Sequence, residues 1–155
     1  MEKYMIEALK EAKKAERQDE VPIGAVVVDG DGQIIGRGHN QTRSLKDPTA
    51  HGEIMAIREA TKKLGRERLV GCDLVVTVEP CSMCAGAIVL ARLRKVYIGI
   101  MDPKGGACGS VLNVLQNEKL NHFTEIQAGI MQQECERIMK DFFKKCRERN
   151  GGSSI

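Results

Sequence analysis

The chain has 155 residues, of which 42% are hydrophobic and 29% are charged. This length is typical of one domain, and this composition is typical of a folded chain and not of a disordered one. No apolar run approaches the roughly 18 residues of a transmembrane helix, and the charged N-terminus lacks the apolar segment of a secretory signal. We therefore expect one domain over residues 1–150 and a flexible tail over residues 151–155, in the cytoplasm and without a membrane partner. The formal net charge of +3 is too small to indicate nucleic-acid binding by itself.

Apolar periodicity and turn residues predict an alternation of helices and strands along the chain. Residues 2–17 carry apolar side chains at helical spacing, and two apolar runs around a Gly/Asp cluster predict a β-hairpin over residues 23–36. Asp47-Pro48 resembles a helix N-cap with proline at the first helical position, and Gly65 ends that helix. The later predicted elements are a strand over residues 73–79, a helix over 84–93, strands over 95–100 and 123–128, and a helix over 130–149. This order predicts an α/β fold, with a mixed sheet that has helices on its faces.

Two short segments, His51-Gly52-Glu53 and Pro80-Cys81-Ser82-Met83-Cys84, contain residue types that bind a metal. A catalytic zinc uses three protein ligands of the imidazole and thiolate kind and keeps one position for water. We predict that His51, Cys81 and Cys84 hold one Zn²⁺ per subunit. Cys81 and Cys84 are three residues apart, so they share one face of a helical turn and can bind the same ion. Glu53 is the predicted catalytic residue, which moves a proton to and from the zinc-bound water. The pattern H-x-E with P-C-x-x-C is that of the zinc-dependent nucleobase deaminases.

One geometric condition accompanies this prediction. Residues two apart on a regular helix point about 200° away from each other, so His51 and Glu53 converge only if their helix begins near His51. Two other interpretations of the motif remain, a redox C-x-x-C pair and a structural zinc site. A structural site needs a fourth ligand, for which His39 and His122 are candidates only by elimination. The remaining four cysteines are expected to be buried or inert thiols and not disulfides.

Further segments accompany these motifs, at residues 21–25, 39–40, 47–53, 79–87 and 102–106. With the zinc motif they resemble the bacterial tRNA-specific adenosine deaminase family of the cytidine/deoxycytidylate deaminase superfamily, from about residue 4 to residue 149. The resemblance implies a single zinc deaminase domain with the cytidine-deaminase-like three-layer sandwich, a five-stranded mixed sheet flanked by helices. It also implies a homodimer that converts the wobble adenosine of an arginine tRNA anticodon to inosine. In that reaction zinc hydroxide attacks C6 of the base and Glu53 acts as the proton shuttle.

The resemblance further implies a set of side chains that bind the tRNA anticodon stem-loop. These are Asn40, Asp102, Lys104, His122, Phe143 and Arg147. Asn40 matches the family residue that hydrogen-bonds the base, although the residues alone favour a turn residue after His39. The basic segment around Phe143 is suited to phosphates and a splayed base, whereas the residues alone favour a solvated helix face with one or both of Phe142 and Phe143 in the core.

Two alternative functions share the same motif. The first is a small-molecule deaminase of the same zinc-dependent fold, which acts on guanine or a free nucleoside. The second is a non-catalytic scaffold stabilised by zinc, and Glu53 argues against it because a structural site does not need that carboxylate.

Overall fold

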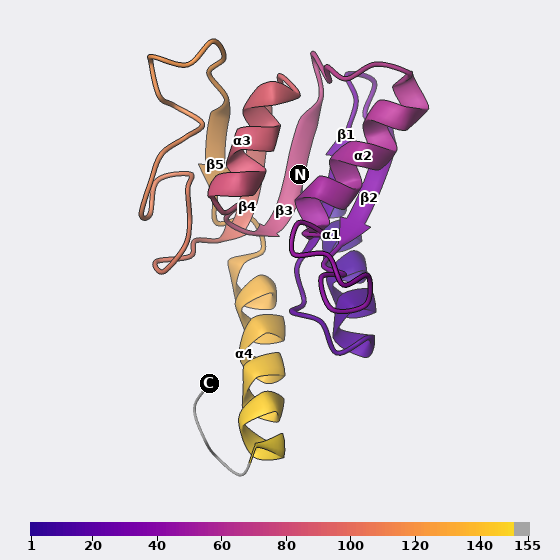
Figure 1. The fold of residues 1–155 in the computed structure, drawn as a ribbon, viewed down its shortest axis with the longest axis vertical. Helices are drawn as coiled ribbons and strands as arrows, with labels where there is room; N and C mark the ends of the chain where they lie inside the picture. The colour runs from indigo at the N-terminus through magenta and orange to yellow at the C-terminus, as the bar shows by residue number, and fades with distance from the viewer. Residues whose placement is uncertain (151–155) are drawn as a thin grey trace.

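The computed structural model describes residues 1–150, so the predicted tail at 151–155 lies outside the described residues. Five strands form one sheet in the order β2-β1-β3-β4-β5 (Figure 1). The strands are β1 (Gly24–Val28), β2 (Ile34–His39), β3 (Asp73–Val78), β4 (Lys95–Ile100) and β5 (Glu125–Ala128). β1 is antiparallel to both β2 and β3, whereas β3, β4 and β5 run parallel. The predicted five-stranded mixed sheet is thereby confirmed.

Four helices form the outer layers of a three-layer sandwich, as predicted. They are α1 (Glu2–Arg17), α2 (Gly52–Leu64), α3 (Ser82–Leu90) and α4 (Gln132–Arg149). Helices α1 and α4 pack on one face of the sheet, and α2 and α3 form the core of the other face. Figure 1 shows that α4 continues beyond the end of the sheet. Among the described residues, no helix combines the length and the apolar character needed to cross a bilayer.

Successive side chains of β1 and β3 point alternately into two hydrophobic clusters, one on each face of the sheet. Val26 and Val75 face the cluster beneath α1 and α4, and Val27 and Val76 face the cluster beneath α2 and α3. All four side chains are fully buried. Both strands are covered on two sides, which explains why each contains consecutive valines and no alternation of polar and apolar residues.

Glycines in β2 bring α2 unusually close to the sheet. A Cβ added to Gly38 would lie 2.5 Å from the backbone nitrogen of Ala56, and closer still to the carbonyl oxygen of Gly52. Gly36 meets the same helix one turn later, where its Cβ would lie 3.0 Å from the backbone nitrogen of Ala60. The start of α2 therefore rests directly on the C-terminal end of β2.

Several predicted boundaries were wrong: α3 ends at Leu90 and not at residue 93, β5 begins at Glu125 and not at 123, and α4 begins at Gln132 and not at 130. The start of α2 also differs, for a local reason. Asp47-Pro48 does not begin α2: Asp47 Oδ1 accepts hydrogen bonds from the backbone N–H (2.8 Å) and the hydroxyl (2.7 Å) of Thr49, which closes a separate turn. Helix α2 begins at Gly52 instead, with His51 as its N-cap. Helix α3 begins at Ser82, two residues earlier than expected. Strand β2 continues to His39 through three further pairs with β1, beyond the predicted end at residue 36.

Candidate functional site

Three predicted metal ligands meet where two helices begin. His51 is the N-cap of α2 and Cys81 is the N-cap of α3, both with extended backbone, and neither side chain caps its own helix. Cys84 lies in the first turn of α3. His51 Nδ1 lies 3.6 Å from Cys81 Sγ and 3.6 Å from Cys84 Sγ, and all three ligand atoms lie within 4.8 Å of one another.

This spacing fits zinc. In a tetrahedral site with Zn–N near 2.1 Å and Zn–S near 2.3 Å, the nitrogen and sulfur ligands are about 3.6 Å apart. Both nitrogen–sulfur distances in the cluster have that value. The partial positive charge of a helix N-terminus also favours thiolate over thiol. One imidazole and two thiolates leave a fourth position for water, as in catalytic zinc sites.

The electrostatics of the two cysteines differ, because Cys81 favours the thiolate whereas Cys84 keeps its proton in the absence of a metal ion. Hydrogen bonds from Cys84 and then His51 lower the pKa of Cys81 to about 3. The bond between the two cysteines raises the pKa of Cys84, and burial raises it further. A metal ion that takes both sulfurs as thiolates releases the proton they share.

Glu53 lies beside these ligands and is almost completely buried, with 3% of its surface exposed. Burial raises its pKa to about 7, so the carboxyl group can bind and release a proton near neutral pH. Its Oε1 atom is buried and has no hydrogen-bond partner in the described part of the chain. Because α2 begins at Gly52, the predicted condition for convergence of His51 and Glu53 is met.

Asn40 also belongs to this centre. It is buried, and its Oδ1 accepts a 2.7 Å hydrogen bond from the backbone N–H of Gly52. That bond satisfies one of the free N–H groups at the start of α2 and fixes which way the amide faces. With the oxygen engaged, the amide NH₂ group is left as the donor for a ligand.

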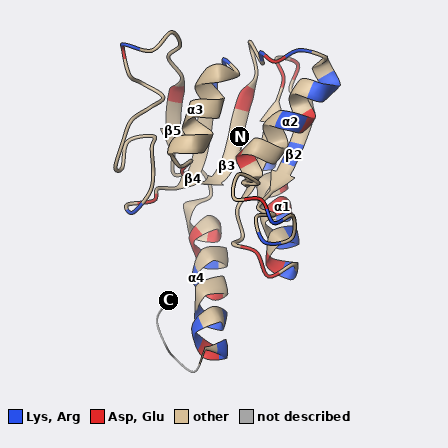
Figure 2. Cartoon of the chain, viewed as in Figure 1, with Lys and Arg blue, Asp and Glu red and all other residues tan. Residues whose placement is uncertain are grey.

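A groove of about 890 Å³ collects three of the predicted RNA-binding residues. Lys104, Phe143 and Arg147 line it, together with Thr42 and Arg43 from the loop after β2. Helix α4 carries six basic and two acidic residues over 137–149 (Figure 2). Of its charged residues, the groove is lined by Lys140, Lys144 and Arg147, and by Glu136 and Asp141.

The two adjacent phenylalanines of α4 have different roles. Both line the groove, but Phe142 is buried, with 7% of its surface exposed, whereas Phe143 is 43% exposed. Their rings meet edge to face with centroids 5.4 Å apart. The two interpretations of this segment, core packing and an exposed binding face, therefore hold for different residues.

Asp102 and His122 occupy very different places. Asp102 Oδ1 accepts the backbone N–H of Lys104 at 3.0 Å, so Asp102 lies beside the groove. His122 Nε2 instead lies 2.6 Å from the carbonyl oxygen of Leu93, just before β4 begins, whereas Lys104 follows the end of β4. The six residues of β4 separate those two ends by about 16 Å. The structure therefore does not bring His122 together with the other predicted substrate residues of the same chain.

Two buried carboxylates that the sequence did not single out hold the loops around the groove. Glu20 is 1% exposed and accepts the backbone N–H of Arg43 (3.1 Å), the backbone N–H of Ser44 (2.7 Å) and the hydroxyl of Ser44 (2.7 Å). Glu79 is 4% exposed and accepts bonds from the loop that follows β4. Burial raises the pKa of each carboxyl group, but the hydrogen bonds outweigh it and hold both pKa values below the ordinary range.

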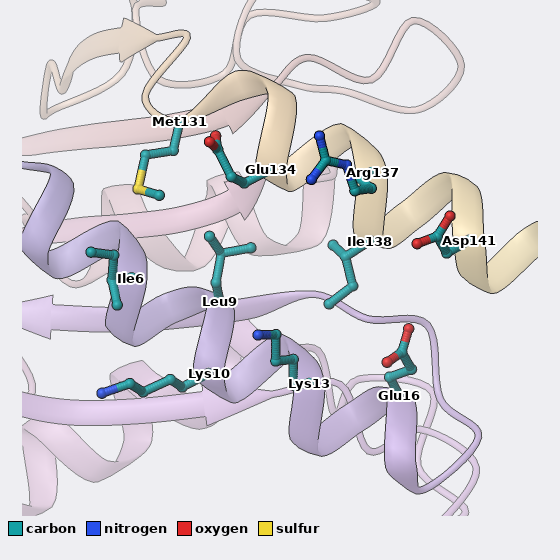
Figure 3. A pocket seen from close by; sticks show the side chains of 10 residues that line it. All are labelled: Ile6, Leu9, Lys10, Lys13, Glu16, Met131, Glu134, Arg137, Ile138 and Asp141. Carbon is teal, nitrogen blue, oxygen red and sulfur yellow. The ribbon is translucent and has the colours of Figure 1, made fainter.

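A second pocket, of about 440 Å³, lies between α1 and α4 (Figure 3). Its floor contains Leu9 and Ile138, and charged side chains of both helices surround it. None of the predicted site residues lines this pocket. It lies on the face of the sheet opposite to the cluster beneath α2 and α3, the helices that begin at the metal ligands.

The chain matches the MafB19-like deaminase family over residues 1–147. The three-layer fold, the His/Cys/Cys cluster and the buried Glu53 beside it are together the features of a deaminase of this class.

Similar proteins of known activity show which family of deaminases the chain belongs to. A tRNA-specific adenosine deaminase of Bacillus subtilis is 50% identical over 148 residues, which cover 96% of this chain and 91% of that protein. A tRNA-specific adenosine deaminase of Agrobacterium fabrum is 48% identical over 144 residues, with 93% and 94% covered. A solved structure from work on A-to-I editing by tRNA:A34 deaminases at the wobble position is 48% identical, with a TM-score of 0.85 over 89% of this chain and 99% of that one. The chain belongs to the tRNA-specific adenosine deaminase family.

A more distant likeness is to a guanine deaminase of Bacillus subtilis. That structure is 40% identical to this chain, with a TM-score of 0.61, and 64% of each chain is covered. Deaminases with a small-molecule substrate therefore share part of this fold.

Proposed function

We propose that this protein is a zinc-dependent hydrolase that deaminates the wobble adenosine of an arginine tRNA anticodon to inosine, with release of ammonia. The observation that carries the proposal is the groove lined by Phe143, Lys104 and Arg147, whose flanking loops are joined to the segments that hold the predicted metal ligands. The loop that contributes Arg43 continues directly into His51, and the loop that contains Lys104 is bonded to Pro80, next to Cys81. A small base or nucleoside does not need such a surface, whereas an anticodon loop does.

In this proposal His51, Cys81 and Cys84 hold Zn²⁺. Zinc in this position supplies a hydroxide nucleophile at neutral pH, because it lowers the pKa of bound water to about 7. Glu53 accepts one proton from water at its carboxylate and delivers it to the ring nitrogen beside C6, and it then carries the second proton of that water to the amine, which leaves as ammonia. Its burial favours this exchange, since it raises the carboxyl pKa to about 7. Asn40 orients the base through its amide NH₂ group.

The groove residues bind the RNA around the flipped base. Phe143 is exposed and can stack on a splayed base, while Lys104 and Arg147 bind phosphates. His122, which lies at the far end of β4, remains a prediction as an RNA contact and is the least supported of the set. Asp102 holds the turn that contains Lys104, because its carboxylate accepts the backbone N–H of Lys104.

We further propose that the protein works as a cytoplasmic homodimer. Large apolar side chains are exposed on α3 and on the long loop between β4 and β5, where a partner subunit would bury them. They include Leu90 (74% exposed), Val111 (55%), Leu112 (53%) and Phe123 (56%).

The proposal is tested with zinc-loaded protein and an arginine anticodon stem-loop that carries adenosine at the wobble position. We expect inosine at that position, and none in a stem-loop whose only loop adenosine lies elsewhere. Glu53→Gln should keep one zinc per chain and lose at least about 100-fold in turnover, because the amide cannot carry the proton. A stem-loop that stays unmodified by the wild-type protein, or a fully active Glu53→Gln variant, would contradict the proposal.

The likeness to a guanine deaminase supports one second candidate, a small-molecule deaminase with the same zinc chemistry. It predicts turnover of guanine or a free nucleoside with the stem-loop left unmodified.

A further inference from the structure

Glu79 lies at the end of β3, and the loop over residues 102–110 folds around its carboxylate. Glu79 Oε1 accepts the backbone N–H of Asp102 at 2.8 Å. Glu79 Oε2 accepts the backbone N–H groups of Cys108 at 2.9 Å and Ser110 at 3.1 Å. The hydroxyl of Ser110 donates a fourth hydrogen bond, to Oε1. One buried side chain thus satisfies both ends of a loop that begins 23 residues and ends 31 residues further along the chain.

The loop also has a glycine at the point where it touches this carboxylate. A Cβ on Gly106 would lie 2.5 Å from Glu79 Oε2, and closer still to the other carboxylate atoms. The φ angle of Gly106 is not positive, so this glycine is needed for space and not for backbone conformation. The loop therefore packs tightly against the Glu79 carboxylate, with no room for a side chain at Gly106.

The same contacts connect the metal centre with the groove. The carbonyl oxygen of Pro80 accepts the backbone N–H of Ala107 at 2.9 Å, and Pro80 is followed directly by the metal ligand Cys81. At the other end of the loop, Asp102 accepts the backbone N–H of Lys104, and Lys104 reaches the groove. The position of Lys104 relative to the metal centre therefore depends on how the loop is held at Glu79.

We propose that Glu79 is a positioning residue for RNA recognition. Its carboxylate fixes the loop over residues 102–110, so that Asp102 and Lys104 contact the RNA at a set position relative to the metal centre. This inference rests on the proposed function. It assigns Glu79 no contact with substrate and no part in proton transfer. A residue that only supported the fold or the metal-binding helix would change stability, zinc content or turnover instead of RNA affinity.

The main test is Glu79→Gln, which keeps the shape of the side chain. The amide replaces one acceptor oxygen with an NH₂ group that faces backbone donors, so the loop loses part of its anchor. We expect the KM for the anticodon stem-loop to rise about 10- to 100-fold, with kcat within about 3-fold of wild type and one zinc per chain retained. Loss of zinc, or a fall in kcat with unchanged KM, would overturn the inference.

Glu20→Gln is the matched control, because it makes the same chemical change in a carboxylate that holds a different loop. Each variant is combined with Lys104→Ala in a double-mutant cycle. Because Glu79 acts through the loop of Lys104, the effects of Glu79→Gln and Lys104→Ala on KM should be strongly non-additive, whereas those of Glu20→Gln and Lys104→Ala should add. Additivity in both cycles would overturn the inference.

A second readout does not depend on RNA activity. In amide hydrogen exchange, the N–H groups of Asp102, Cys108 and Ser110 should exchange faster in Glu79→Gln, with the amides of β3 unchanged. Unchanged exchange at all three amides would contradict the inference even if the stem-loop proved not to be the substrate. If Glu79→Gln fails to fold, Ser110→Ala removes one donor from the same carboxylate, and we expect a smaller rise in KM. No rise in KM for Ser110→Ala would then count against the inference.

Discussion

Replacing Gly38 by alanine should disturb the metal centre, because the added methyl group pushes the start of α2 away from β2. Gly38 has no side chain to keep β2 away from the start of α2, and an added Cβ would lie 2.5 Å from the backbone nitrogen of Ala56. Its closest neighbour would be the carbonyl oxygen of Gly52, the residue between His51 and Glu53. Both neighbours are backbone atoms of a helix, so no side-chain rotation can relieve the clash.

The size of the effect follows from the contact distance. A non-bonded carbon contact is favourable near 3.5 Å, so α2 must move by about 1 Å to accept the methyl group. Overpacking of this kind typically costs about 1–3 kcal/mol. For a chain of this length that corresponds to a fall of roughly 2–12 °C in Tm. A displacement of about 1 Å at catalytic groups can cost about 100-fold in turnover, which is the loss expected for Gly38→Ala.

Gly36→Ala is the matched comparison. It adds the same methyl group against the same helix, at Ala56 and Ala60, one turn further from the metal ligands. We expect a similar fall in Tm for both variants, and a clearly smaller loss of kcat for Gly36→Ala. Tm, zinc content and kcat on the stem-loop are measured for each variant. A Gly38→Ala protein with wild-type Tm and turnover would refute the reasoning from close packing.

The remaining predictions concern the groove, the metal and the buried carboxylates. Phe142→Ala should destabilise the fold by about 3–5 kcal/mol in chemical denaturation, because this ring is buried. Phe143→Ala should change stability by less than about 0.5 kcal/mol but weaken stem-loop binding by about 1–3 kcal/mol, because its ring is exposed in the groove. Chelation of zinc should lower Tm by about 8–16 °C relative to protein with zinc at 1,000 times its Kd, and added zinc should restore it. Glu20→Gln should cost about 1–3 kcal/mol of stability at pH 7, because it leaves buried donors without a charged partner. The pKa of Glu20 in the fold lies below the ordinary 4.5, so this stabilisation is complete above pH 4.5 and is lost as the pH falls through the folded value. The difference in unfolding free energy between Glu20→Gln and wild type should therefore shrink in acid and not in alkali.

The cluster of one histidine and two cysteines was predictable because its information is local. His51, Cys81 and Cys84 stand in short motifs whose residue types and spacing match what zinc requires, and the folded chain brings them within ligand distance. The sheet was predictable for a similar reason, since β1 and β3 contain consecutive valines between turn signals. The start of α2 was not, because Asp47 could serve either as a helix cap or as the acceptor of a local turn.

Long-range contacts explain most of what the sequence did not indicate. Phe142 and Phe143 are neighbours in a basic segment, and only the packing of α4 decides which ring is buried. Glu20 and Glu79 hold loops that lie more than 20 residues away, and no local pattern predicts that pairing. The position of His122 depends on a hydrogen bond to Leu93 across two loops, which removes it from the groove of its own chain.

The measurement that tests the central claim most directly compares substrates with a single preparation of zinc-loaded protein. The values of kcat/KM are determined for the arginine anticodon stem-loop with wobble adenosine, for free adenosine, for cytidine and for guanine. RNA editing through the groove of Lys104, Phe143 and Arg147 predicts efficient turnover of the stem-loop and little or none of the free bases and nucleosides. Efficient turnover of guanine or a free nucleoside, with the stem-loop unmodified, would contradict the claim and leave only the zinc chemistry of the site.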